Sequence, residues 1–422
     1  MNIAEKLSFY HTSFPKKIYH LIQREKAKQK IKSKGKLKII GIVGSYGKTS
    51  AANAIHHILP KSQKTDTNLD TVFNLPLTIS NLKKSTDYLV LEMGVDHKNE
   101  MDFHLDLVKP NIIVFTGITP VHSDKEHMGS LEGIKQEKGK AVKALSATDI
   151  IIYNFDDQNV RDIADKSKAK KISYSKATRK TDIYLDKYQI SPQGTSYLIK
   201  SNITNKSYQL NTKLYGKLFA DSFMAAIAVM ENQKLPITSS LKKLEQIKPL
   251  KGRMSLENFF NHSTLLNDRL RANPASVKAG LETANDLRKY FKRTVIVLGE
   301  MGELGSRTKI EHIEIGKFIN KFKFDYVLGI GPNTKHILEK ISGDITKTKY
   351  FDNPVQAAEY LKTINIRTKD LVYLKASLLR HLERVEMVLS GKKVNCDILS
   401  CPLYNNCEDC AYLSTKYPTK SS

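Results

Sequence analysis

One segment, residues 38–59, most constrains how this chain can fold. It reads KIIGIVGSYGKTSAANAIHHIL: an apolar run, with Leu37 before it, expected to be a strand over 37–43, glycines at 41, 44 and 47, and an amphipathic helix expected over 49–59. Such a turn lets backbone N–H groups and a helix N-terminus surround phosphate, with a lysine on the phosphates and a hydroxyl on Mg²⁺. The strict GxxxxGK[ST] spacing fails, because Gly41 lies one residue too early. The segment predicts a phosphate-binding loop; an ordinary glycine-rich turn is the alternative.

The rest of the chain alternates between short apolar runs and helical stretches. This alternation predicts an α/β fold with parallel sheets covered on both faces. A polar alternating stretch over 183–210 predicts antiparallel strands, and the chain is expected to pass into a second α/β domain near 241–252. The remaining expected strands are 88–93, 111–115, 149–153, 294–298, 326–330 and 371–374, and the remaining expected helices are 131–145, 218–231, 309–322 and 378–389.

Composition narrows the class of protein. The 422 residues carry 68 Lys+Arg against 43 Asp+Glu, a net charge of +25, with 40% hydrophobic residues. This content supports folded domains and excludes disorder and collagen. No apolar run reaches the ~18 residues of a membrane span, and the first residues lack the apolar core of a secretory signal, so a cytoplasmic location is expected.

The positive charge gathers near the N-terminus. Residues 16–38 hold ten basic residues and one acid, Glu25. A solvated tail or surface helix is the simplest reading, and contact with a phosphate-rich partner or an anionic membrane surface is the alternative. A nucleic-acid partner is not expected.

Six motifs, in order, resemble those of the Mur ligase family, most closely its D-alanyl-D-alanine-adding branch. GSYGKTS resembles that family's phosphate loop GTNGKT[TS], and EMGVDHKNEM resembles EMGANHxGEI. Matches also occur at GITPVHSDKEHMGSLEGIKQEKGK, KGRMSLE, NDRLRANPASV and VLGEMGELG. The resemblance covers roughly residues 37–390. It implies a P-loop central domain (37–247) and a C-terminal Rossmann-like α/β domain (248–392), preceded by a basic segment (1–36) and followed by a cysteine-rich tail (393–422).

The resemblance also implies chemistry and site residues. An ATP-dependent amide ligase turns a substrate carboxylate into an acyl phosphate, which an amine then attacks, and protein cations stabilise the transferred phosphoryl charge. The implied nucleotide ligands are Gly44, Gly47, Lys48, Thr49, Ser50, Asp268 and Asn273. Arg253 is implied to contact the γ-phosphate, and Lys375 matches the lysine of the family's C-terminal KGS motif. The implied Mg²⁺ ligands are Thr49 and Glu92 for a first ion, and His122 and Lys138 for a second. Lys138 falls at the family's carbamylated lysine, whose carboxylate-like oxygens suit Mg²⁺. Each of these residues could instead be an ordinary loop, helix or inter-domain residue.

Several positions depart from the family pattern. Gly117 replaces an asparagine, Leu218 and Ser222 replace a histidine and an asparagine, and further changes fall at Asp70, Asn74, Leu270 and Arg271. Only about 40 residues precede Gly41, too few for the separate domain that grips UDP in the family. We therefore expect the acceptor substrate to be recognised differently or to lack UDP.

The four cysteines lie within fifteen residues. Cys396, Cys401, Cys407 and Cys410 are spaced C-x4-C-x5-C-x2-C, which is not a standard zinc-ribbon pattern. Their clustering favours a Zn²⁺ site or an iron–sulfur cluster with four thiolates. A loose reduced tail and redox use are the alternatives.

The sequence therefore predicts a monomeric, Mg²⁺- and ATP-dependent ligase that joins D-Ala-D-Ala or a similar amine to an anionic cell-wall peptide precursor. A ligase for another acidic substrate, such as a polyglutamate or cyanophycin-like chain, is one alternative. A nucleotide-binding scaffold without ligase activity is the other.

Overall fold

The structure is a computed structural model that describes residues 2–66, 70–120, 127–343, 346–403 and 406–415. The chain forms two compact units, which are described separately. Unit 1 comprises residues 1–189, 196–212 and 218–247. Unit 2 comprises residues 190–195, 213–217 and 248–422.

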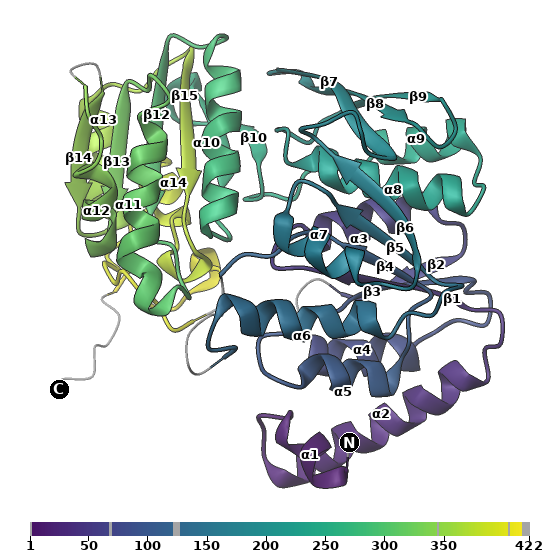
Figure 1. Ribbon diagram of the computed structural model, residues 1–422. Coiled ribbons are helices and arrows are strands. Elements are labelled where there is room, and N and C mark those ends of the chain that lie inside the picture. The colour runs from purple at the N-terminus through teal and green to yellow at the C-terminus, as the bar shows by residue number, and fades with distance from the viewer. Residues whose placement is uncertain (1, 67–69, 121–126, 344–345, 404–405, 416–422) are drawn as a thin grey trace. The chain divides into compact units, whose positions relative to one another are not determined.

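A nine-stranded sheet forms the centre of unit 1 (Figure 1). Its strands from β2 to β6 pair in parallel, as the alternating pattern predicts. Strand β7, in the segment expected to be antiparallel, also pairs with β6 in parallel. The connections after β7 and β8 are too short for a parallel crossover, so the last strands run as hairpins. The order is β2 (Ser62–Lys64), β3 (Tyr88–Glu92), β1 (Lys38–Val43), β4 (Ile112–Phe115), β5 (Ile150–Asn154), β6 (Lys170–Ser175), β7 (Ile183–Ser191), β8 (Gly194–Ser201) and β9 (Ser207–Thr212).

Helices cover both faces of this sheet, because the central strands are apolar on both sides. One layer packs α3 (Lys48–Ile58), α8 (Phe219–Asn232) and α9 (Ile237–Glu245) together (Figure 1). On the other face, each helix of a second layer contacts the next: α4 (Thr71–Ser80), α5 (Glu100–Leu107), α6 (Leu131–Lys143) and α7 (Gln158–Asp165).

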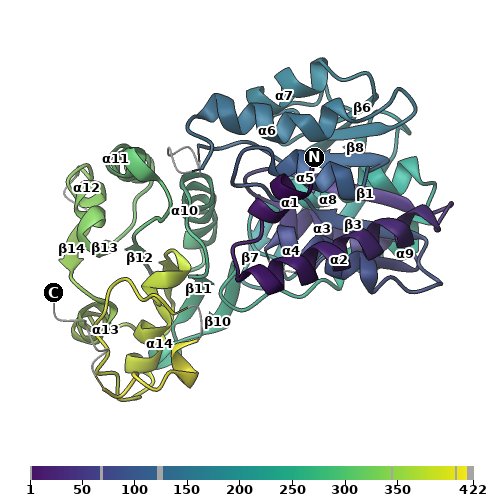
Figure 2. The same ribbon diagram turned by 90° about the horizontal axis from the view of Figure 1, so that it is seen from below.

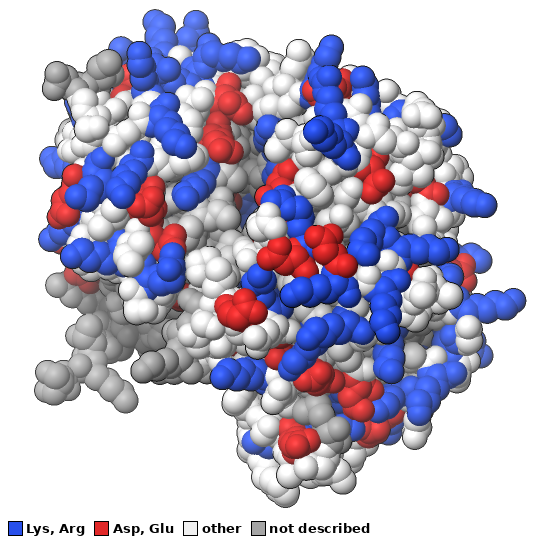
Figure 3. Space-filling model, in the orientation of Figure 1, with Lys and Arg blue, Asp and Glu red and all other residues white. Residues whose placement is uncertain are grey.

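The basic N-terminal segment is helical and packs on unit 1. Helix α1 (Ile3–Ser8) precedes α2 (Phe14–Lys32), which contacts α4 and α5 (Figure 2). Arg24 is fully buried and donates to the Phe103 carbonyl. Several charges of this segment are therefore engaged within the unit. Lysine and arginine side chains are spread over the visible face of each unit, interleaved with acidic ones (Figure 3).

A six-stranded sheet forms the centre of unit 2, and all its pairs except β10–β11 are parallel. Helices α10, α11 and α12 follow one another on one face, and α13 packs against α14 on the other (Figure 1). The strand order is β10 (Ser255–Asn258), β11 (Thr264–Asp268), β15 (Asp370–Lys375), β12 (Arg293–Gly299), β13 (Tyr326–Ile330) and β14 (Lys347–Phe351). The helices are α10 (Pro274–Arg288), α11 (Thr308–Ile319), α12 (Lys335–Leu338), α13 (Pro354–Thr363) and α14 (Glu383–Leu389), with short 3-10 turns at η1 (Phe260–His262), η2 (Gly305–Arg307), η3 (Pro332–Thr334), η4 (Leu378–Arg380) and η5 (Cys407–Asp409).

The α/β class with parallel sheets is confirmed, but one predicted helix is wrong. The apolar pattern over 378–389 predicts one continuous helix, whereas the chain forms η4 and then α14. His381 between them has φ 46° and ψ 54°, a left-handed conformation that no α-helix contains. The break places the His381 side chain in the interior.

Among the helices within the described ranges, none combines the length and the apolar character that a membrane crossing requires.

Candidate active site

The predicted phosphate loop connects β1 to α3 at the carboxyl edge of the unit 1 sheet. Gly44 and Gly47 have φ of 151° and 73°. A Cβ on Gly44 would lie 2.1 Å from Thr116 Oγ1, so this position excludes a side chain. Lys48 bends back over the loop and donates from Nζ to the Gly44 carbonyl at 2.8 Å. The loop therefore has the backbone that phosphate binding needs, with its lysine lying across it.

Thr49 and Glu92 meet beside this loop. Thr49 lies in the first turn of α3, Glu92 is the last residue of β3, and the Thr49 hydroxyl donates to Glu92 Oε2 at 3.0 Å. The second carboxylate oxygen, Oε1, is buried and has no hydrogen-bond partner among the described residues. Because a buried carboxylate oxygen is costly to leave unpaired, this pair fits a hard cation such as Mg²⁺.

Lys138 projects from α6 into the same neighbourhood. Its side chain is 3% exposed, and Nζ donates to the Val95 carbonyl at 3.2 Å. Burial, followed by the charge of Lys48, lowers the pKa of Lys138 to about 7. A substantial fraction of the amine is thus uncharged near neutral pH, which is the form that reacts with CO₂.

Three carboxylates surround Lys138 without pairing with it directly. The charges of Glu100, Asp96 and Glu137 act against the lowering of its pKa. Glu137 accepts from the amide of Met101 at 2.8 Å, and Glu100 accepts from the amide of Asp96 at 2.9 Å. These bonds hold the loop between β3 and α5 in place around the amine.

A cavity of about 650 Å³ borders this loop. Its wall combines the loop with α1 and the residues after it, so the N-terminal segment shapes it. The lining is rich in carboxylates, with few basic groups. The lining residues are Glu5, Ser8, Phe9, His11, Asp70, Val72, Asp96, His97, Lys98, Asn99, Glu100 and Asp102.

The remaining predicted ligand of this unit, His122, lies outside the described residues. Ser50 lies in the first turn of α3, immediately after Thr49. The structure therefore brings together Gly44, Gly47, Lys48, Thr49, Ser50, Glu92 and Lys138 in unit 1.

The predicted residues of unit 2 gather at the carboxyl ends of β11 and β15. Asp268 and Lys375 pair in register there, and Lys375 Nζ donates to Asp268 Oδ2 at 2.5 Å. Burial raises the pKa of Asp268, while Lys375 and Arg253 oppose this rise. Asn273 instead caps α10, accepting from the Ser276 amide at 2.9 Å. The carboxyl edge of a parallel sheet is where ligands bind in such folds, and Asn273 has a structural task there.

The cysteine segment packs against the start of α14. Cys396, Cys401 and Cys407 are buried, and Cys410 is partly buried. The group of ligand atoms that forms there joins Cys407 to His381 and Glu383 rather than to the other thiols. The sequence pattern missed these two partners because they precede the cysteines by more than a dozen residues.

A second relationship missed by the sequence links Tyr46 to Gly117. A Cβ on Gly117 would lie 2.2 Å from Cζ of the Tyr46 ring. Both residues replace asparagines of the motif pattern, and the glycine leaves the space that the ring fills. Tyr46 lies in the loop after β1 and Gly117 lies just after β4, and these two strands are parallel neighbours, so this pairing of changes could have been suspected.

Family models match most of the chain: the Mur ligase middle domain over residues 42–230, and the Mur ligase glutamate ligase domain over residues 252–378. The UDP-N-acetylmuramoyl-tripeptide–D-alanyl-D-alanine ligase of Bacillus subtilis is 30% identical over 356 residues, covering 82% of this chain and 75% of that protein.

Two solved structures share the fold. MurF from Acinetobacter baumannii superposes with a TM-score of 0.78 at 22% identity, covering 88% of this chain and 81% of that one. MurF from Thermotoga maritima in complex with ADP gives a TM-score of 0.74 at 22% identity, covering 88% and 84%.

Proposed function

The chain belongs to the Mur ligase family, and we propose that it is an ATP-dependent peptide ligase of the MurF type. The reaction would convert a substrate carboxylate to an acyl phosphate and then join it to an amine, with D-Ala-D-Ala as the first candidate. The Bacillus subtilis relative is a UDP-N-acetylmuramoyl-tripeptide–D-alanyl-D-alanine ligase. The observation that carries the proposal is the pairing of the phosphate loop with Thr49, Glu92 and Lys138.

The chain's own groups supply binding and charge stabilisation. The loop amides around Gly44 and the N-terminus of α3 would hold the ATP phosphates, and Lys48 would turn from the Gly44 carbonyl to the transferred phosphoryl group. The Lys48 side chain would have to move only a short way, because its Nζ already lies over the loop. The lysine thus neutralises charge where it develops in the transition state.

A first Mg²⁺ would be held by Thr49 and Glu92, and a second Mg²⁺ would be held by Lys138 once it is carbamylated. When bound, Mg²⁺ neutralises phosphate charge and orients the phosphates. The partnerless Oε1 of Glu92 supports this assignment. Lys138 becomes a ligand only if its neutral amine gives up a proton and forms a carbamate with CO₂, and its pKa of about 7 favours that step. His122 stays a prediction as a ligand of the second Mg²⁺.

The unit 2 residues Arg253, Asp268 and Lys375 are proposed to contact nucleotide or the transferred phosphate. Their support is the position of the Asp268–Lys375 pair at a carboxyl sheet edge. For Asn273, the cap of α10 accounts for its side chain, so its role in nucleotide binding has weaker support.

The carboxylate-rich cavity supports a cationic group on one substrate. Five of its lining residues are acidic, and one of them, Asp102, pairs with Lys140 at 2.6 Å. In the basic segment, Lys28 binds Asp106 at 2.7 Å and Lys30 binds the Ser80 carbonyl at 2.6 Å. Phosphate recognition by that segment, membrane contact, a cytoplasmic location and a monomeric state remain predictions.

Phosphate release in the presence of candidate substrates tests the proposal. The purified chain should release phosphate from ATP only when both a carboxylate acceptor and an amine are present. A screen of acceptors, read as ATP-dependent mass gain, should then identify the pair. The Lys48→Ala variant is the control for phosphate release and mass gain that do not depend on the phosphate loop. Mass gain with a glutamate chain instead would favour a polyglutamate-type ligase, and nucleotide binding with no product from any pair would favour a scaffold.

A further inference from the structure

The cysteine segment is anchored by one buried arginine. Arg384 on α14 is fully buried and donates to the carbonyls of Cys396 at 3.0 Å and Ile398 at 2.7 Å. The Cys401 amide donates to the Leu379 carbonyl at 2.9 Å. These backbone bonds fix the thiol-bearing loop against η4 and α14, so its cysteines have defined positions.

His381 faces this loop from the break between η4 and α14. Its side chain is 2% exposed, and its ring nitrogens each lie near an oxygen. Nδ1 is 2.8 Å from Glu383 Oε1, and Nε2 is 3.0 Å from the Leu403 carbonyl. A metal-binding histidine commonly donates its second ring nitrogen to such a carbonyl, which fixes the ring and leaves the other nitrogen for the ion.

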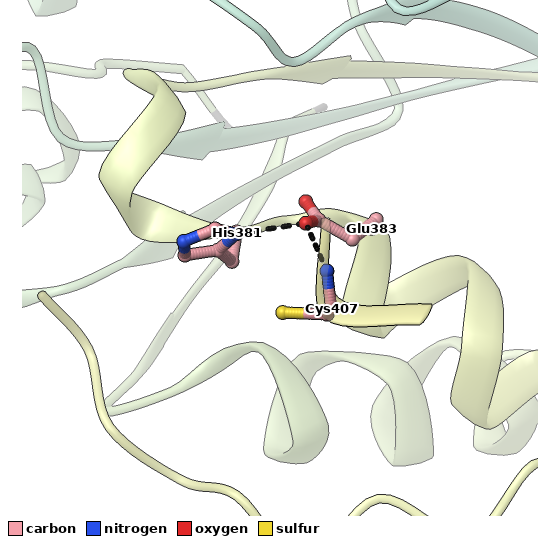
Figure 4. Close-up of side chains that lie close together, drawn as sticks. All are labelled: His381, Glu383 and Cys407. Carbon is pink, nitrogen blue, oxygen red and sulfur yellow. Dashed lines mark hydrogen bonds and ion pairs between the residues drawn. The ribbon is translucent and has the colours of Figure 1, made fainter. Parts of the chain in front are cut away.

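Cys407 completes a group of three donors. A ring nitrogen of His381, a Glu383 carboxylate oxygen and Cys407 Sγ all lie within 4.8 Å of one another, and all three residues are buried. Figure 4 shows Cys407 Sγ directed to the side on which the His381 ring lies, with Glu383 hydrogen-bonded to both residues. Donors around one Zn²⁺ at 2.0–2.3 Å are roughly 3.5 Å apart, so a small closure would suffice.

The charges of this group also suit a cation. Burial alone would raise the pKa of Glu383, but the hydrogen bond and charge of His381 lower it to about 2. Burial, and then the charge of Glu383, raises the pKa of Cys407 to about 12. Without an ion, a buried carboxylate thus opposes ionisation of the adjacent thiol, and a dication would remove that opposition.

Cys396 is the candidate for a fourth donor. Arg384 Nη1 lies 3.7 Å from Cys396 Sγ, and the charges of both Arg384 and Cys396 act on the Cys407 thiol. Two thiolates and one carboxylate on Zn²⁺ leave one negative charge, which the buried guanidinium of Arg384 would balance. Among the described residues, neither Cys401 nor Cys410 belongs to the group of donor atoms around His381 and Cys407.

We propose that unit 2 binds one structural Zn²⁺ through His381, Glu383, Cys396 and Cys407. On binding, the two thiols lose their protons to solvent and His381 offers Nδ1 to the ion. The mixed donor set replaces the four-thiolate centre expected from the cysteine spacing, and it disfavours an iron–sulfur cluster, which draws on four cysteines. The ion would fasten the loop to α14, independently of ligase activity.

Zinc content of the full chain, purified without a metal-affinity tag, tests the proposal. The wild-type chain should hold about one zinc per chain. Cys407→Ser, Cys396→Ser and His381→Gln should each lose most of it, whereas the matched controls Cys401→Ser and Cys410→Ser should retain it. Loss of zinc from all four cysteine variants with retention in His381→Gln would establish a four-thiolate site and overturn the proposal.

A wild-type measurement guards against variants that fail to fold. Replacing zinc by Co²⁺ should give thiolate charge-transfer absorbance corresponding to two cysteines and ligand-field bands of a tetrahedral site. A spectrum corresponding to four thiolates, or failure of the intact chain to retain either ion, would refute the donor set. Removing zinc with a chelator should lower the thermal midpoint of unfolding.

Discussion

The Thr49 hydroxyl donates to Glu92 Oε2 at 3.0 Å, which joins the start of α3 to the end of β3. The other oxygen of this carboxylate is buried without a partner among the described residues. The unpaired oxygen can therefore bind a further group, and a hard cation such as Mg²⁺ is the simplest candidate.

Glu92→Gln should separate the hydrogen bond from the charge. The amide oxygen can still accept from Thr49, but the carboxylate that would bind Mg²⁺ is gone. We expect ligase turnover to fall on the order of 10²-fold and the required Mg²⁺ concentration to rise. Titrating Mg²⁺ at saturating ATP measures both. Glu132→Gln, an exposed change at the start of α6, is the control; equal Mg²⁺ dependence in both variants would argue against the site.

Lys48→Ala should greatly slow ligation while leaving the fold intact. The variant removes the cation next to the transferred phosphate, a loss of about 3 kcal/mol, or on the order of 10²-fold in turnover. Steady-state phosphate release and a thermal melt give the two readouts. Lys61→Ala, whose side chain is largely exposed after α3, should behave as wild type. Near-normal turnover of Lys48→Ala would contradict the phosphate-loop assignment.

Lys138 should depend on CO₂ and on pH. Its lowered pKa of about 7 means that the neutral amine, and with it the carbamate, increases as the pH rises through that value. Activity at fixed bicarbonate should therefore rise between about pH 6 and pH 8. Lys138→Ala should be inactive and partly restored by small carboxylates that replace the lost oxygens.

Lys143→Ala, an exposed lysine on the same helix, is the control for Lys138→Ala. Normal turnover by Lys138→Ala would contradict the proposal that activity requires a carbamate on Lys138. Between its lowered pKa and 10.5, Lys138 is less protonated in the folded state than in the unfolded chain. Its burial therefore lowers the stability of the fold most at low pH, and this cost falls as the pH rises.

Gly117→Ala should displace the Tyr46 ring. The new Cβ would lie 2.2 Å from the ring, so the variant should lose about 1–3 kcal/mol of stability and bind nucleotide more weakly. Adding Tyr46→Ala should recover part of the loss, because the smaller side chain leaves room for the methyl group. A double-mutant cycle in urea measures the coupling, and additive effects would show that the two residues do not compete for this space.

Asp106 should stabilise the docking of the N-terminal helices in a pH-dependent way. Partial burial alone would raise its pKa, but hydrogen bonds and charges from Lys28 and Lys6 lower it well below the usual range. Its contribution is therefore present above pH 3.8 and is lost as the pH falls through the lowered value. Asp106→Asn should be less stable than wild type at neutral pH, and the difference should shrink in acid.

Urea unfolding at several pH values gives that difference, with Asp87→Asn as the exposed control. A difference between wild type and Asp106→Asn that does not change with pH would show that the Asp106 charge contributes nothing to docking.

The sequence by itself determined the architecture and the phosphate loop. Alternating apolar runs and helical stretches set the order of strands and helices, because local periodicity reflects which face each element buries. The glycines of the loop are local as well, since Gly47 must adopt a backbone conformation that few other residues tolerate. Sequence motifs also selected Glu92 and Lys138, although no local pattern distinguishes Lys138 from its lysine neighbours.

The tertiary structure decided which side chains meet. Burial of Lys138 near Lys48, the fit of Tyr46 over Gly117, and the meeting of His381, Glu383 and Cys407 all join residues distant in the chain. Periodicity predicted a continuous helix through His381 because it registers apolar spacing and not backbone hydrogen bonds. The break at His381 follows from packing in the interior, where the cysteine segment supplies partners that no local pattern could reveal.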